Sequence, residues 1–313
     1  MTTLEVVNAY LASRRALGVR LTRDDRALRQ FARETGNLPL REVTPEAVAG
    51  FLRGRGVLSA TWTRKYCMLT GMFRFAIARG YVSASPLPEH PPKLPPQQTP
   101  YVYSTGELRR LMDATAMLYH SVSPLRADTY RTLLLLLYGA GLRISEALAL
   151  TLSDVDLPQR VITVRETKFY KTRLVPVGPC LTDELAVHFD RRSALALPRG
   201  PNSAFLCSRT GHRLAYAAVI TLFQRVRAAA QIGCPPGESR PPRLHDLRHT
   251  AAVHRVVAWY RTGKDVQRLL PQLATYLGHV DIKSTQRYLQ MTPELLHEAS
   301  RRFAIYAQEA NHE

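Results

Sequence analysis

Long apolar runs and paired cysteines are both missing from this chain of 313 residues. The longest apolar run, 133–137, is too short to span a bilayer, and the residues from Met1 to Glu5 do not predict a signal peptide. The four cysteines lie far apart in the sequence and form no C-x-x-C pair, which is typical of free thiols in a reducing compartment. We therefore expect a cytoplasmic protein that does not contact a membrane.

Acidic residues are scarce relative to basic ones. The chain has 25 Asp and Glu against 43 Lys and Arg, which gives a net charge of +18 and a pI near 10.2. Residues 1–100 carry 15 basic and 7 acidic side chains, so about +8 of this charge lies in the first third. Such an excess attracts polyanions, and no basic amphipathic helix points to a membrane surface. The composition therefore predicts a protein that binds nucleic acid.

Several common catalytic motifs are also absent. The sequence has no G-x-S-x-G elbow and no glycine-rich phosphate loop with a lysine, which argues against serine hydrolases and P-loop nucleotide enzymes. His245 and His249 have the i, i+4 spacing of metal ligands, but Asp246 stands where a metalloprotease has Glu. Arg248 between them would repel a metal ion. We therefore expect neither a metal nor a cofactor.

The hydrophobic pattern predicts a mostly α protein with a small β-sheet (α+β) in two domains. Residues 3–81 have the apolar spacing of a small helical bundle, with a strong helix start at Thr44-Pro45-Glu46 and a stop at Gly80. Residues 85–100 are so rich in proline that they predict an extended connector. We expect a DNA-binding domain at 1–84, a linker at 85–100 and a catalytic domain at 101–313.

The second half combines helices with one β-hairpin. Strands are expected at 161–164 and 173–177, joined by a turn that carries Lys168 and Lys171. An extended piece is expected at 204–206. Helices are expected from 104, at 127–138, 181–195 and 215–230, around His245, and at about 293–306.

Side chains that suit a phosphodiester recur in this half. Arg143 follows two glycines at 139 and 141 that permit a tight turn, and we expect Ser145 to cap the next helix. His245, Arg248 and His279 can all donate hydrogen bonds to a phosphate, and arginine offers two parallel donors. Tyr288, nine residues after His279, can act as a nucleophile. This combination predicts phosphoryl transfer through a covalent intermediate.

The order of these motifs resembles the tyrosine site-specific recombinases, the phage-integrase and Xer-type enzymes. The shared motifs are G-L-R-x-S-E-x-L at 141–148, a hairpin lysine before R-x-V-P, H-x-x-R at 245–248, G-H at 278–279, and the tyrosine. The resemblance implies the fold, an N-terminal helical SAM-like core-binding domain before a catalytic domain. It also implies the catalytic residues, which are Arg143, Lys168, His245, Arg248, His279 and Tyr288 (the nucleophile).

The chain departs from this family at two places. Thr167 and Phe169 stand where glycines usually flank the hairpin lysine, so Lys171 remains an alternative to Lys168 as the proton donor. More residues separate Arg248 from His279 than is usual, with the excess around 259–264.

The function that the resemblance implies is DNA recombination by cutting and rejoining strands through a 3′-phosphotyrosyl link. It would serve integration, excision or resolution of a mobile element in association with the bacterial nucleoid, without ATP or metal. The expected partners are double-stranded DNA with an inverted-repeat core site, further copies of the chain in a homo-tetramer, and possible accessory recombinases or a directionality factor. Type IB topoisomerase-like relaxation and a non-catalytic DNA-binding accessory protein remain the alternatives.

Overall fold

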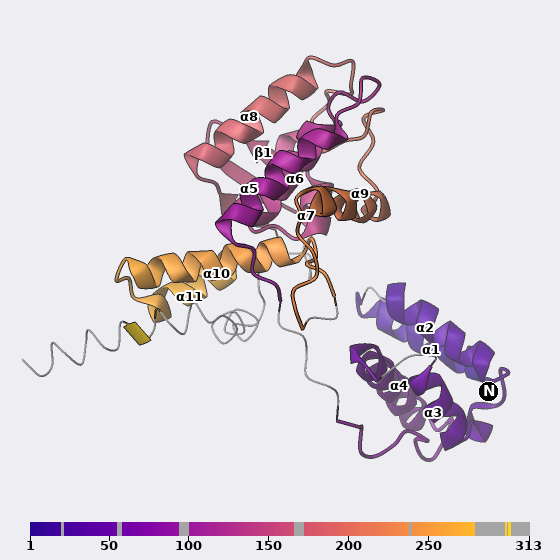
Figure 1. The fold of residues 1–313 in the computed structure, drawn as a ribbon. Helices are drawn as coiled ribbons and strands as arrows, with labels where there is room; N and C mark the ends of the chain where they lie inside the picture. Colours follow the sequence, from indigo (N-terminus) through magenta and orange to yellow (C-terminus); the bar gives the residue numbers. More distant parts are fainter. Residues whose placement is uncertain are drawn as a thin grey trace, which may run out of the picture. The chain divides into compact units, whose positions relative to one another are not determined.

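The structure of the chain is a computed structural model. It describes residues 1–19, 22–54, 58–93, 100–165, 172–237 and 240–278, together with 298, 300 and 301. The chain forms two compact units, Met1–Gln98 and Thr99–Glu313, here called the first and second unit. Both units are predominantly helical (Figure 1). The only sheet among the described residues is small, and the predicted fold class is therefore confirmed. The exact ends given above for the two domains stay predictions.

The first unit is a bundle of four helices. They are α1 (Thr3–Ala16), α2 (Thr22–Glu34), α3 (Pro45–Arg53) and α4 (Ala60–Ala78), with a 3-10 turn at Leu40–Glu42. The start at Thr44 is confirmed, since its side chain accepts a hydrogen bond from the amide of Ala47. The core is built around Phe31, whose ring meets those of Phe51 and Phe73 edge to face. Burial of these rings holds the helices together.

The beginning of the proline-rich segment packs on the first unit. The hydroxyl of Tyr66 donates a hydrogen bond to the carbonyl of Pro88 at 3.0 Å, and Tyr66 stacks on Trp62. Pro88 and Pro92 line a small hollow beside Trp62. This part of the segment is therefore anchored to α4. Residues 94–99 of the linker lie outside the described part of the chain.

The second unit is built on α6, whose leucines are almost all buried. Its helices are α5 (Thr105–Ala114), α6 (Arg126–Gly139), α7 (Ile144–Ala149), α8 (Pro179–Ser193), α9 (Tyr216–Ala229), α10 (Asp246–Arg261) and α11 (Val266–Leu277), with 3-10 turns at Thr115–Leu118 and Leu152–Asp154. Helices α5, α7, α8 and α10 pack against α6 (Figure 1). The helix expected from 104 is α5, and Ser104 and Glu107 form a capping box at its start.

The sheet has three antiparallel strands in the order β1-β2-β3. Strands β2 (Val161–Val164) and β3 (Arg173–Pro176) form the predicted hairpin, with Ile162 opposite Val175. Strand β1 (Val155–Asp156) was not predicted, because two residues are too few to show an alternation. In the piece at 204–206, an isolated bridge pairs Ala204 with Thr151, and the two residues that follow form a bend.

Helices α10 and α11 form a second apolar cluster of the second unit. Val253, Val256 and Val257 of α10 pack with Leu270 and Leu273 of α11. The residues around 259–264, where the excess length was noted, form the end of α10 and the turn into α11. No helix of the described ranges is long and apolar enough to cross a membrane.

Candidate active site

Arg143 stands at the entrance of α7, and its position follows from the turn before it. Gly141 has a φ of +61°, and a Cβ there would lie 2.7 Å from a methyl group of Leu277. Only glycine fits this turn without strain. The prediction that Ser145 caps the helix is wrong, because Arg143 itself is the N-cap residue. Its amide donates to the Glu146 carboxylate at 2.9 Å, so Glu146 satisfies the helix start instead.

Arg248 is the most deeply buried of the predicted arginines, with 1% of its surface exposed. It lies in the first turn of α10, and its guanidinium donates to the carbonyls of Gly141 and Leu277. These carbonyls belong to the turn before Arg143 and to the last residue of α11. The orientation of Arg248 is therefore fixed by the same two chain segments that carry Arg143 and lead to His279.

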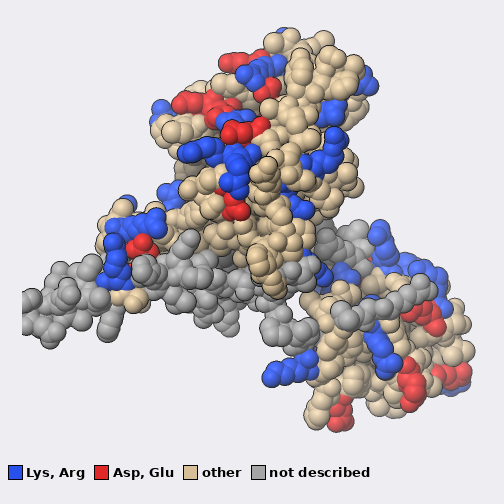
Figure 2. Space-filling view, in the orientation of Figure 1, with Lys and Arg blue, Asp and Glu red and all other residues tan. Residues whose placement is uncertain are grey.

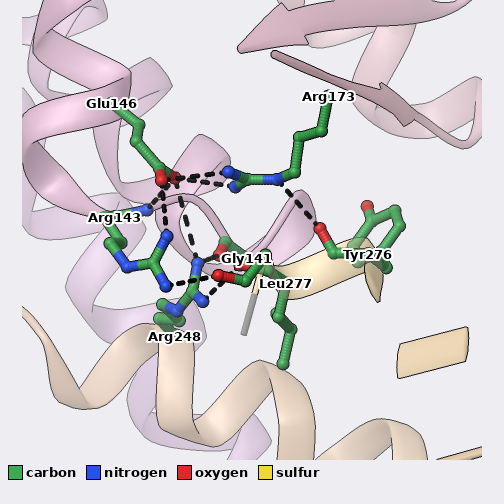
Figure 3. Close-up of polar contacts among 8 residues, drawn as sticks. Gly141, Arg143, Glu146, Arg173, Arg248, Tyr276 and Leu277 are labelled. Carbon is green, nitrogen blue, oxygen red and sulfur yellow. Dashed lines mark hydrogen bonds and ion pairs between the residues drawn. The ribbon is translucent and has the colours of Figure 1, made fainter. Parts of the chain in front are cut away.

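Glu146 joins the arginines into one cluster (Figure 3). Its buried carboxylate accepts hydrogen bonds from Arg143 Nη1 at 2.6 Å and from Arg173 Nη1 and Nη2 at 3.0 and 2.7 Å. Arg248 Nη1 lies 4.0 Å from it. Burial alone raises the pKa of Glu146, but the hydrogen bonds and charges of Arg173 and Arg143 outweigh it and lower the pKa to about 2. The carboxylate is thus ionised throughout the neutral range.

The cluster has a surplus of positive charge. Three arginines surround one carboxylate, so the four side chains together carry a charge of +2. Arg143 is the most accessible of the three, with 31% of its side chain exposed against 12% for Arg173 and 2% for Arg248. The guanidinium groups of Arg143 and Arg248 form a partly buried pair, which suits an anion with two acceptor oxygens such as a phosphodiester.

His245 stands at the N-cap of α10, one turn before Arg248 on the same segment. Burial, followed by the charge of Arg248, lowers the pKa of His245 below its ordinary value. Its ring is therefore neutral at neutral pH and can accept one proton while donating another. The ring of His249 lies 4.6 Å away and nearly perpendicular. Among the described residues no group of three His, Cys, Asp or Glu gathers in a form that suits a metal ion.

Three of the six predicted residues, Lys168, His279 and Tyr288, lie outside the described residues, as does the alternative Lys171. The structure shows only where the chain enters and leaves their segments. Residues 166–171 connect β2 to β3, and Gly278 ends α11 directly before His279. Gly278 has a φ of +68°, and a Cβ on it would lie 2.8 Å from Arg173 Nη1. The site role of all six residues stays a prediction.

Glu146 and Arg173 are the two site residues that sequence reasoning did not assign. Both stand inside recognised motifs, Glu146 in G-L-R-x-S-E-x-L and Arg173 at the start of R-x-V-P. Their pairing joins α7 to β3 across 27 residues, and β3 in turn packs beside α11. Their places inside these two motifs were the available signal, although neither motif encodes the pairing.

Residues 104–294 match the sequence model of the phage integrase family. A putative integrase/recombinase of Sinorhizobium fredii, y4rB, is 35% identical over 312 residues, which cover 96% of each chain. Tyrosine recombinase XerD of Mycobacterium tuberculosis is 32% identical, over 88% of this chain and 87% of its own. Among solved structures, the lambda integrase tetramer bound to a Holliday junction has a TM-score of 0.68 at 17% identity. That comparison covers 92% of this chain and 77% of the integrase, and at this identity it concerns the fold.

Proposed function

Because this chain belongs to the phage integrase family and is a site-specific tyrosine recombinase, we propose that it breaks a DNA strand with the hydroxyl of Tyr288. The product of this attack is a 3′-phosphotyrosyl ester and a 5′-hydroxyl. Reversal with a 5′-hydroxyl from a second duplex rejoins the strands in a new combination. The energy of the broken bond is kept in the ester, so neither ATP nor a cofactor is needed.

The observation that carries this proposal is the arginine cluster around Glu146. Arg143 and Arg248 come together from segments about a hundred residues apart, and the four charged side chains keep a surplus of +2. Positive groups held in place before reaction stabilise the charge that builds on the non-bridging oxygens. We assign this role to Arg143 and Arg248, and we assign His245 and His279 to hydrogen bonds with the same oxygens.

Two proton transfers complete the mechanism. Tyrosine has a pKa near 10 in water and is a weak nucleophile unless its proton is removed. The neutral ring of His245 is suited to accept that proton. The leaving 5′-oxygen needs a proton as its bond breaks. We assign this second transfer to Lys168 in the β2–β3 connection, with Lys171 as the alternative.

The proposed substrate is double-stranded DNA with an inverted-repeat core site, bound by residues 1–84 and 101–313 around the linker 85–100. Lys and Arg are spread over the visible surface of each unit, with Asp and Glu between them (Figure 2). On α4 of the first unit, Arg64 and Arg74 are exposed, as is Arg79 directly after the helix, whereas Lys65 binds the carbonyl of Phe51. We propose a homo-tetramer on two paired sites, as in the lambda integrase structure. Integration, excision or resolution of a mobile element is the proposed setting, with accessory recombinases or a directionality factor as further partners.

The test is formation of the covalent adduct in the presence of EDTA. The probe is a duplex that the protein itself selects from genomic fragments, nicked close to the cleavage site so that the 5′-product diffuses away. Wild-type protein is expected to give an adduct that survives denaturing electrophoresis, and Tyr288→Phe is expected to bind the duplex without forming it. An adduct that needs Mg²⁺ or Zn²⁺ would contradict the arginine-centred mechanism. Binding without any adduct would favour an accessory DNA-binding protein, and relaxation of a single plasmid without strand exchange would favour a topoisomerase.

A further inference from the structure

Arg173 lies at the first residue of β3, and the mechanism above gives it no role. All three of its guanidinium nitrogens are engaged (Figure 3). Nη1 and Nη2 bind the two oxygens of Glu146 as a fork, at 3.0 and 2.7 Å, and Nε donates to the carbonyl of Tyr276 at 3.2 Å. Its side chain is 12% exposed. Arg173 is therefore committed to protein partners through its whole guanidinium.

Arg143 binds the same carboxylate in a different way. Of its guanidinium nitrogens only Nη1 reaches the carboxylate, through a single bond to Oε1, while Nη2 donates to the carbonyl of Gly278. Arg143 therefore does not form a fork with Glu146, because Arg173 holds that position. This arrangement leaves Arg143 more accessible than its neighbour.

We propose that Arg173 is a positioning residue, which holds the Glu146 carboxylate so that Arg143 stays available to the scissile phosphate. This inference rests on the proposed function, in which Arg143 binds that phosphate. A fork between arginine and carboxylate is stronger and more directional than a single charged hydrogen bond. A buried carboxylate without such a partner is costly, so it would take the nearest one available. Without Arg173 that partner is Arg143.

Loss of Arg173 has two consequences in this arrangement, and both weaken phosphate binding in the transition state. The charge of the cluster falls from +2 to +1, and Glu146 is expected to rotate into a fork with Arg143. Neither consequence acts on the lysine of the hairpin. A competing explanation is that Arg173 anchors β3 and thereby positions Lys168, because it also ties β3 to the end of α11 through Tyr276. The two explanations predict opposite results with a sulfur-substituted substrate.

The first experiment separates catalysis from binding. Cleavage of the nicked duplex is measured under single-turnover conditions with saturating protein, beside a separate binding titration. Arg173→Ala is expected to cleave roughly tenfold to a hundredfold more slowly, the loss typical of a misplaced catalytic group, with its Kd for the duplex changed less than twofold. Arg173→Lys keeps the positive charge but cannot form the fork, and its cleavage rate is expected to lie between those of the wild type and Arg173→Ala. Arg131→Ala is the matched control, since it loses a partly exposed arginine–carboxylate pair with Glu184 between α6 and α8. It is expected to cleave at the wild-type rate.

The second experiment asks whether Arg173 acts through Glu146. Glu146→Gln removes the charge that would capture Arg143, so adding it to Arg173→Ala is expected to raise the cleavage rate above that of Arg173→Ala alone. Independent effects, in which the double variant is slower by the product of the two single losses, would overturn the proposal. So would recovery of Arg173→Ala on a duplex with sulfur at the bridging 5′ position, because that result assigns the defect to the lysine.

Failure of this inference can be told apart from failure of the proposed function. If the wild-type protein forms no Tyr288 adduct, the proposed function is wrong and the variants are not informative. If the wild-type adduct forms and Arg173→Ala forms it at the same first-order rate, only the role of Arg173 is wrong. Thermal unfolding of each variant checks that the folded fraction is unchanged at the assay temperature. A rate loss that matches a loss of folded protein would also overturn the positioning role.

Discussion

The smallest unit of the mechanism that can be tested alone is the proton donor. The 5′ leaving group is a strongly basic alkoxide, whereas a thiol in its place has a pKa near 8.5 and leaves without help. Lys168→Ala is therefore expected to cleave the normal duplex slowly and a duplex with a bridging 5′ sulfur at close to the wild-type rate. Single-turnover rates on the two duplexes measure this difference.

Two further variants decide between the possible origins of the effect. Arg143→Ala is expected to be slow on both duplexes, because it acts on the phosphate and not on the leaving group. Sulfur rescue of Lys171→Ala with none of Lys168→Ala would move the proton donor to the later lysine. Both lysines lie outside the described residues, so this pair of variants also fixes the register of the β2–β3 connection.

His245 gives the reaction a predictable pH dependence. Burial and the charge of Arg248 hold its pKa below 6.5, so the folded protein keeps the ring neutral at pH 6.5 and above. As the pH falls, the histidine of the unfolded chain takes up a proton before that of the folded chain. Protonation therefore favours the unfolded chain, and the free energy of unfolding decreases below pH 6.5. The cleavage rate at limiting protein, which reports the free enzyme, is expected to stay level from pH 8 to 6.5 and to decline only below that. An acid limb centred above pH 6.5, or one that persists in His245→Asn, would rule out His245 as the base.

At this scale the sequence predicted residue types well and contacts poorly. Arg143 and Arg248 were identified from their motifs, and the structure brings them to one carboxylate. Ser145 was a reasonable N-cap by residue type, but the backbone places Arg143 at that position, and Glu146 binds its amide. The partner of Glu146 on β3 was not predictable, because nothing in the local sequence of either residue encodes a pairing across 27 positions.

Among the secondary-structure elements, the end of α11 is tightly constrained. Gly278 and Gly263 have the same φ of +68°, but a Cβ on Gly278 would press against the Arg173 guanidinium, whereas one on Gly263 would have no heavy atom within 4 Å. Alanine at either position is expected to cost about 1–2 kcal/mol of stability for the left-handed conformation. Only Gly278→Ala is expected to slow cleavage as well, because it displaces Arg173.

Denaturant unfolding and single-turnover cleavage of the two alanine variants give the comparison. Equal stability losses with a rate loss confined to Gly278→Ala would show that the helix end carries a catalytic constraint. A similar rate loss in Gly263→Ala would mean that the strain itself, and not the contact with Arg173, is responsible.

The elements themselves were largely predictable, because periodicity and caps are local signals. The helix starts at Thr44 and Ser104 and the β2–β3 hairpin are where the residues place them. Strand β1 was missed because it exists only through its pairing with β2. The helix expected at 293–306 lies mostly outside the described residues, although Glu298 binds Arg261 at the end of α10.

The whole molecule is expected to hold DNA with both of its units. About +8 of the net charge lies in residues 1–100 and the remainder after them, so neither half carries the whole electrostatic attraction. Each unit has its own buried core, and fragments 1–95 and 101–313 are therefore suitable for separate study. Each fragment is expected to bind the selected duplex more weakly than the full chain, with a shallower dependence of log K on log salt. Full affinity and full salt slope in the 101–313 fragment would show that the first unit does not contribute to DNA binding.

The central claim is that one tyrosine becomes covalently bonded to the cut strand, while the arginine cluster stabilises the charge on the phosphate. The most direct measurement is mass-spectrometric mapping of the trapped adduct after digestion of the protein and the DNA. The mechanism predicts a single modified peptide in which a nucleotide is attached through its 3′-phosphate to Tyr288, formed in EDTA and absent from Tyr288→Phe. Attachment to any other residue, or through a 5′-phosphate, would contradict it.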